Sequence, residues 1–230
     1  DIWGTYGHFR KPYSTNSSLS YFFPTKPTIV GILAAIVGYQ KDSYYDLIDI
    51  IKVSLIIRDK EKLRKDIFTV NYENTKESGR EVFNSPVNVE LLLNPKYTIF
   101  LYVDENLSKE NEKLKNLYSF LLDNLKKHRS VYTASLGSAF CIANFKFFEE
   151  MDATHGKDKD IIINSIFPKK GNKIKIAKDN HIIIENMPYL LDNNRKPIEF
   201  IDFYADIKGN GLMLKEGSYY KVGNENVIFF

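Results

Sequence analysis

The chain has 230 residues, of which 43% are hydrophobic, and its formal net charge is +3. This apolar content excludes a wholly disordered chain and leaves room for one large domain or two small ones. The single cysteine, Cys141, excludes an internal disulfide, and the longest apolar run, Thr28 to Val37, is too short to cross a bilayer. We therefore expect no membrane association and a reducing, cytoplasmic location.

The chain begins with a short strand and a buried helix. Residues 1–4 are typical of a strand end, and we expect a few residues of that strand to precede them. The helix begins between Pro24 and Pro27, because proline is tolerated in a first helical turn, and it ends at Gly38. Its apolar residues, Ile29 to Val37, cover every face, which predicts burial on all sides.

Two predicted strands frame an insertion. Residues 50–59 are rich in β-branched side chains, and residues 96–105 repeat this strand composition. Residues 60–94 between them are charged and mixed, with glycine and proline as turn signals. We interpret this insertion as an exposed β-hairpin arm.

The clearest periodic pattern predicts a helix over residues 108–129. Ser108 is the expected N-cap, and acidic residues in the first turn with basic residues in the last complement the helix dipole. A strand is expected over residues 138–150, with Cys141 as a buried thiol. The helix's buried stripe is expected to comprise Leu114, Leu117, Tyr118, Leu121, Leu122 and Leu125.

The order of elements predicts an α+β fold. Strand, helix, strand, arm, strand, helix and strand form the ferredoxin-like (RRM-type) βαββαβ arrangement, which we assign to residues 1–150, with the inserted β-hairpin arm at about 60–94. The remainder, residues 151–230, shows short strand patterns separated by turn residues and no convincing helix. We expect a small all-β C-terminal part with strands at 161–167, 173–178, 181–186, 198–207 and 226–230.

Sequence motifs for metals, nucleotides and hydrolytic nucleophiles are missing. None of the four histidines stands at ligand spacing from another histidine or from a cysteine, and there is no CxxC. No Walker loop, GxGxxG or GxSxG motif is present. The sequence therefore predicts no metal site and no cofactor.

The segment from Gly7 to Tyr39 places cationic and hydroxyl-bearing side chains directly before the apolar helix. These side chains and helix N-termini are the groups that contact phosphates in nucleic-acid complexes, and the interleaved aromatic rings can stack on unpaired bases. A solvated loop with caps and turns explains the same residues about equally well. The RNA-binding candidates in this segment are His8, Arg10, Lys11, Tyr13, Ser14 and Lys26.

A second candidate runs from the end of the 108–129 helix into the following loop. Tyr132, Ser135 and Gly137 are its RNA-binding candidates, because glycine would let the backbone approach a ligand closely. A simple helix stop and turn explains the pattern better. Lys127, His128 and Tyr132 could in principle cleave RNA without a metal, but Lys and His at a helix C-terminus are ordinary partners of its dipole, which is the favoured interpretation.

These segments resemble a known family. Gly7 to Tyr39 resembles the N-terminal signature of the CRISPR-associated Cas family five, a branch of the RAMP superfamily. Phe9-Arg10-Lys11-Pro12 and the run from Tyr21 through Gly31 match its pattern residue by residue, and the first of these is most similar to the type I-B branch. The sequence "VYTASLGSAFCIANF", residues 131–145, resembles the family's Tyr-Thr-x-x-Leu-Gly segment.

The resemblance implies a non-catalytic, RNA-binding subunit of a type I Cascade surveillance complex in antiviral defense. Such a subunit grips the 5′ handle of the CRISPR RNA and caps the backbone filament, with a hairpin thumb that would correspond to Phe68 to Glu90. The implied partners are the CRISPR RNA, the Cas family seven backbone subunit and the Cas family eight large subunit, with target DNA near the protospacer-adjacent motif left open.

Two alternatives remain open at this point. In type I-C systems the family member itself is a metal-independent endoribonuclease that uses Tyr, Lys and His, and the sequence does not establish that Lys127 and His128 align with that site. The other is a generic RRM-type RNA binder outside CRISPR systems.

Overall fold

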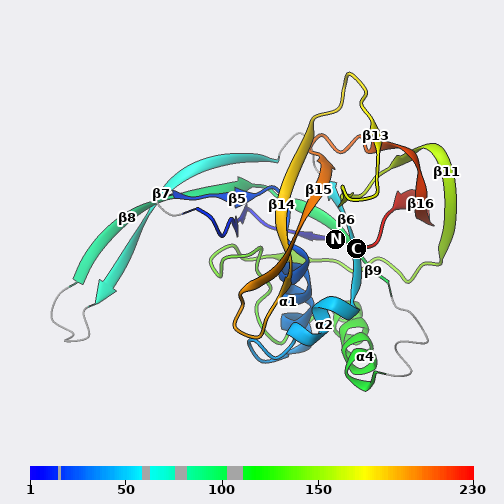
Figure 1. Ribbon diagram of the computed structural model, residues 1–230. Helices are drawn as coiled ribbons and strands as arrows, with labels where there is room; N and C mark the ends of the chain where they lie inside the picture. Colours follow the sequence, from blue (N-terminus) through cyan, green and yellow to red (C-terminus); the bar gives the residue numbers. More distant parts are fainter. Residues whose placement is uncertain (15–16, 59–62, 76–81, 103–110) are drawn as a thin grey trace.

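A four-stranded antiparallel sheet forms the centre of the fold in the computed structural model, which describes residues 1–14, 17–58, 63–75, 82–102 and 111–230 (Figure 1). Its strand order is β10-β1-β9-β6, and every neighbouring pair is antiparallel. The strands are β1 (Ile2–Trp3), β6 (Lys52–Arg58), β9 (Lys96–Tyr102) and β10 (Asn144–Phe145).

The strand expected over residues 138–150 is wrong for most of its length, because only β10 is a strand there. The Cys141 N–H donates to the Ser138 carbonyl oxygen at 2.9 Å, which closes a turn where the sequence suggests extended chain. Cys141 is buried as expected, and its burial raises the pKa of the thiol to about 11.

The helix predicted after Pro24 is confirmed as α1 (Lys26–Val37). Thr25 caps its first turn, where the Thr25 side chain accepts from the Thr28 N–H at 3.3 Å, and Gly38 ends it with φ of +96°. Eight of its residues are buried, so the expectation of a buried helix is correct.

The second long helix, α4 (Glu112–Lys126), is shorter than predicted. Asn111 caps it by accepting from the Leu114 N–H at 3.1 Å, and the expected cap, Ser108, lies outside the described residues. Leu114, Leu117 and Leu121 are buried, as the stripe predicts. A six-residue helix, α2 (Tyr45–Ile50), was not predicted; its N-cap residue makes no side-chain capping bond.

An antiparallel hairpin projects from the body of the protein (Figure 1). It consists of β7 (Arg64–Thr75) and β8 (Val82–Leu93), and it lies within the range over which the sequence predicts an exposed arm. Phe68, Val70 and Val87 near its base pack against the main hydrophobic core. The arm is therefore anchored to the core at one end.

The N-terminal segment runs along the base of this hairpin as four very short strands. β2 (Tyr6–Gly7) pairs antiparallel with β8, and β4 (Ser17–Ser18) pairs with β8 in parallel. β3 (Phe9–Arg10) pairs with β5 (Ser20–Tyr21), so the segment folds back on itself before α1 begins.

Residues 151–230 form two antiparallel sheets and contain no helix. The first comprises β11 (Ala153–Ile163), β16 (Leu212–Val222), β13 (Ile174–Lys175) and β17 (Glu225–Val227). The second comprises β12 (Phe167–Pro168), β15 (Pro197–Asp206) and β14 (Ile182–Leu191). β16 was not predicted, because its central Lys-Glu-Gly disfavours a strand; pairing with β11 overrides this local composition.

The C-terminal strands share the main core with the rest of the chain. Met187 and Phe203 belong to the same buried cluster as Phe23, and Val53 and Phe230 exchange two backbone hydrogen bonds of 3.1 and 2.9 Å. A division at residue 150 stays a prediction. No helix in the described ranges has the length and apolar character needed to cross a membrane.

Candidate nucleic-acid interface

The first predicted binding residue, His8, lies in the interior. It is only 5% exposed, with its Nδ1 2.8 Å from the Glu90 carbonyl oxygen and its Nε2 2.9 Å from the Ser18 hydroxyl. Burial lowers the pKa of His8, although the Glu90 carbonyl opposes this effect. His8 therefore ties the N-terminal segment to the arm, and its ring is not placed to meet a phosphate in solvent.

Lys11 is held by a carboxylate from the C-terminal sheet. Its Nζ lies 2.6 Å from Glu185 Oε2, and the two side chains are only 15% and 8% exposed. Burial acts to lower the pKa of Lys11, but the hydrogen bond and charge of Glu185 outweigh it and raise that pKa. The Ser14 hydroxyl also turns inward and donates to the Lys11 carbonyl oxygen at 2.7 Å. Lys11 and Ser14 therefore make internal contacts that stabilise the N-terminal segment.

A second ion pair joins the two strands of the arm, and its carboxylate also binds the N-terminal segment. Lys65 Nζ lies 3.1 Å from Glu90 Oε2, which also accepts from the Ser20 N–H at 2.8 Å. Lys65 Nζ stands 4.0 Å from the centre of the Phe22 ring. Burial lowers the pKa of Lys65, against the raising effect of Glu90. β5, β7 and β8 are therefore joined by one buried polar network.

Lys26, at the start of α1, is buried rather than presented to solvent. It is 3% exposed, its Nζ donates to the Tyr189 hydroxyl at 3.1 Å, and it lies 4.5 Å from the centre of that ring. Burial lowers the pKa of Lys26 to about 8. Its surroundings are those of a packing residue between α1 and β14.

Several side chains of the segment are exposed and could meet RNA. Tyr13 is 60% exposed and Leu19 38% exposed, and Arg10 and Ser17 are also exposed. Within the described residues, no hydrogen bond or ion pair holds the Arg10 guanidinium. We call Arg10, Tyr13, Ser17 and Leu19 the outer N-terminal surface. It offers a cation, an aromatic ring and a hydroxyl, which suit phosphate contact and base stacking.

The loop around Gly137 approaches the chain's own backbone rather than a ligand. The His8 N–H donates to the Leu136 carbonyl oxygen at 2.9 Å, and a Cβ on Gly137 would lie 2.0 Å from the His8 carbonyl oxygen. Gly137 also has φ of +91°, which favours glycine. Ser135 pairs with Ile142 across the same turn. The backbone at Gly137 does make the close approach that the sequence predicts, but it approaches His8 of the same chain and not a ligand.

The proposed cleavage residues lie at the end of α4 without mutual contacts. Lys127 Nζ is 2.6 Å from Asp123 Oδ1, and the His128 ring lies 5.0 Å from the Phe145 ring at 36°. Tyr132 is 49% exposed, and its N–H donates to the Ala35 carbonyl oxygen at 3.0 Å. In the part of the chain that the structure describes, no hydrogen bond or ion pair joins Lys127, His128 and Tyr132 to one another.

The sequence gives no signal for the residues that organise this interface. Glu185 lies 174 positions from Lys11, and Glu90 lies 25 positions from Lys65, so no local pattern links either pair. Tyr189 lies outside every strand that the sequence predicts and 163 positions from Lys26. Across the described ranges, no cluster of three or more His, Cys, Asp or Glu side chains could hold a metal ion.

The fold and this interface define a class of protein: a mixed α/β chain with a projecting hairpin arm, whose N-terminal segment presents a small cationic and aromatic surface. The family model described as CRISPR-associated protein (Cas_Cas5) matches residues 1–211. The chain therefore belongs to this family of CRISPR-associated proteins, as the N-terminal resemblance predicts.

Solved structures resemble the chain at low identity. One, titled "CRISPR RNA-guided surveillance complex", is 9% identical with a TM-score of 0.49, covering 96% of this chain and 89% of that one. A Type III-B Cmr-beta complex bound to cognate target RNA and AMPPnP is 12% identical with a TM-score of 0.48, covering 93% and 85%. No curated protein matches the chain.

Proposed function

We propose that the chain is a non-catalytic RNA-binding subunit of a type I Cascade complex, which grips the 5′ handle of the CRISPR RNA. Membership of the CRISPR-associated family carries this proposal, and the outer N-terminal surface supplies a place for the RNA. The sheet order β10-β1-β9-β6, with α1 and α4 as its connecting helices, is that of a ferredoxin-like (RRM-type) domain and supports assigning one to residues 1–150.

In this proposal the buried network positions the surface and the exposed residues contact the RNA. Arg10 neutralises a phosphate, and Tyr13 stacks on an unpaired base. Lys11 and Lys65 keep their carboxylate partners and hold the segment rigid against the arm. A rigid surface loses little conformational entropy when RNA binds, which favours affinity.

The contacts at the end of α4 support a structural role for that region rather than RNA cleavage. Lys127 and Arg129 both pair with Asp123, and His128 packs on Phe145. Basic groups there complement the helix dipole. We further propose the backbone subunit of Cas family seven and the large subunit of Cas family eight as partners in the cytoplasm.

Fluorescence anisotropy with labelled handle RNA from the same organism tests the proposal. We expect Arg10→Gln to weaken binding several-fold and to reduce the slope of log K against log salt by about 0.7, because one phosphate contact is lost. Tyr13→Ala should weaken binding by about 1–3 kcal/mol with an unchanged slope. Arg129→Gln is the charge-matched control, since Arg129 is also exposed but pairs with Asp123.

Unchanged affinity in both Arg10→Gln and Tyr13→Ala would remove the RNA from the outer N-terminal surface. Loss of affinity in Arg129→Gln alone would move the RNA to the end of α4. A parallel incubation of full repeat RNA in EDTA separates binding from cleavage, because the proposal expects intact RNA.

A further inference from the structure

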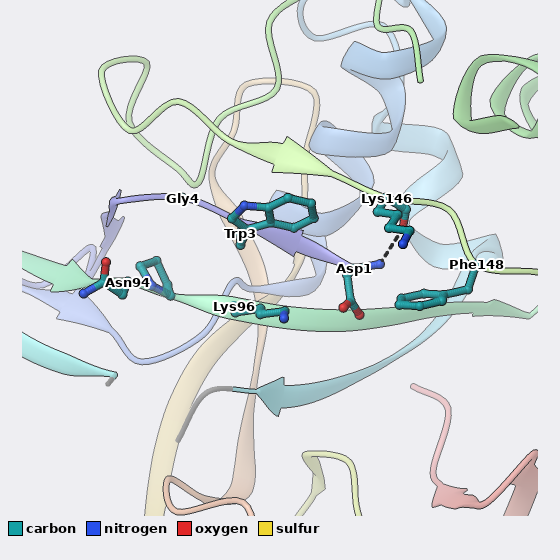
Figure 2. Close-up of a pocket in the computed structure, with 8 residues that line it drawn as sticks. Asp1, Trp3, Gly4, Asn94, Lys96, Lys146 and Phe148 are labelled. Atoms are coloured by element: carbon teal, nitrogen blue, oxygen red, sulfur yellow. Dashed lines mark hydrogen bonds between the residues drawn. The ribbon is translucent and has the colours of Figure 1, made fainter. Parts of the chain in front are cut away.

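A cavity of about 420 Å³ opens on the central sheet, and none of its lining residues belongs to the outer N-terminal surface (Figure 2). Trp3 from β1, Lys96 from β9, and Lys146 and Phe148 from the chain after β10 all line it. Asn94 and Pro95, directly after β8, form its side next to the arm. The cavity therefore lies where the arm joins the sheet.

The position of the cavity follows from the two faces of the sheet. Tyr97 is fully buried on the same side as its cross-strand partner Ile2, so Lys96 and Trp3 point to the opposite face. Farther along β9, C-terminal residues cover this opposite face, where Tyr102 packs on Phe229 at 5.3 Å. Trp3, on the same face of the sheet, is partly exposed.

Backbone hydrogen bonds hold the cavity walls in place. The Gly4 N–H donates to the Pro95 carbonyl oxygen at 3.2 Å, which joins the end of β1 to the start of β9. The Lys146 N–H donates to the Asp1 carbonyl oxygen at 2.9 Å, which keeps the chain after β10 beside β1. The cavity is thus preformed, as small-ligand sites usually are.

The cavity combines two aromatic rings with ammonium groups. Phe148 is 58% exposed and Trp3 is partly exposed, and Figure 2 shows the Trp3 ring beside β1, the Phe148 ring beside β9 and Asp1 between them. Lys146 Nζ lies 5.6 Å from the centre of the Phe148 ring. Aromatic faces beside lysines are the features by which proteins bind single-stranded nucleic acid, through base stacking and phosphate neutralisation.

We propose that this cavity binds one unpaired nucleotide of the RNA, with its base against Trp3 and Phe148 and its phosphate near Lys146. The proposal rests on the proposed function, and it adds a second contact point for the RNA besides the outer N-terminal surface. The volume lies within the range of about 300–1,000 Å³ that is typical of small-molecule sites. RRM-type sheets stack unpaired bases on aromatic residues of an open sheet face in the same way.

Trp3 makes the test direct, because it is the single tryptophan of the chain. Unlabelled handle RNA is titrated into the full chain while tryptophan emission is recorded, with N-acetyltryptophanamide as the inner-filter control. We expect saturable quenching of Trp3. Phe148→Ala should weaken RNA binding about five-fold or more, as removal of one stacking ring does. Lys146→Gln should reduce the slope of log K against log salt by about 0.7, because one phosphate contact is lost.

Phe120→Ala is the matched control, because Phe120 is 59% exposed on α4, outside the cavity. It should bind RNA like the unaltered chain. Circular dichroism of Phe148→Ala and Phe120→Ala checks that both variants are folded.

Anisotropy of labelled RNA distinguishes the two proposals. Two results would overturn the nucleotide site and leave the proposed function standing. One is RNA binding without quenching of Trp3 emission. The other is that Phe148→Ala and Lys146→Gln both bind RNA like the unaltered chain. An absence of RNA binding by anisotropy overturns both. Equal losses in Phe148→Ala and Phe120→Ala also overturn the site, since the effect would then not depend on the cavity.

Discussion

The ion pair between Lys11 and Glu185 joins the N-terminal segment to the C-terminal sheet, and its removal should destabilise the fold measurably. At 2.6 Å the Coulomb attraction is about 6 kcal/mol at an effective dielectric of 20, and desolvation of the two ions opposes it. Removing one partner of a buried pair typically costs about 3–5 kcal/mol. Because Lys11 keeps 15% exposure, we expect about 3 kcal/mol for Lys11→Met or Glu185→Met.

A double-mutant cycle measured by urea unfolding tests this magnitude. The double variant Lys11→Met/Glu185→Met should lose much less than the sum of the single variants, because it leaves no unpaired charge. Lys126 and Glu150 provide the control: their atoms are 2.9 Å apart, but the side chains are 51% and 52% exposed. Exposed pairs contribute about 0–1 kcal/mol. A coupling energy for Lys11–Glu185 no larger than that of the control pair would refute the reasoning.

Two further predictions concern single residues, Gly137 and Lys26. Gly137→Ala should destabilise the fold by at least about 2 kcal/mol, and by more than Gly171→Ala does. Both glycines have positive φ, but only a Cβ at position 137 would lie 2.0 Å from the His8 carbonyl oxygen. Equal losses of stability in urea unfolding would contradict this. Lys26 has its pKa lowered by burial to about 8 from 10.5, so the unfolded state binds more protons between these values and stability should rise with pH there. Lys26→Met should remove that rise, which is on the order of 3 kcal/mol, when unfolding is compared at pH 7.5 and 10.

The elements that the sequence predicts correctly are those with strong local patterns. α1 is apolar on every face and ends at a glycine, and α4 has one apolar stripe, so periodicity locates both. Capping residues locate the end of α1 at Gly38, but the cap of α4 is Asn111 and not the predicted Ser108. The failures have the opposite character. β16 depends on its pairing with β11, and residues 138–150 turn where their composition suggests a strand. In these cases tertiary contacts override local propensity.

The sequence also predicts only part of the candidate site. The sequence shows that cationic and hydroxyl-bearing residues gather before α1, but not which of them face solvent. That depends on Glu185, Glu90 and Tyr189, which come close to the segment only in the folded chain. A buried carboxylate partner far along the chain leaves no periodic or motif signal near the lysine that it neutralises.

The ion pairs of Lys11 and Lys65 limit how strongly salt weakens RNA binding. Lysines that already neutralise carboxylates release no counterions when RNA binds, so they add nothing to the salt dependence of binding. Arg10 and Lys146 are then the cations to which the two proposals assign a phosphate contact. Two phosphate contacts give a slope of only about −1.4 for single-stranded RNA. The isolated chain should therefore hold RNA mainly by stacking and shape, with binding that falls little between low and physiological salt; a slope of −4 or steeper would show that the buried lysines leave their carboxylates to meet the RNA.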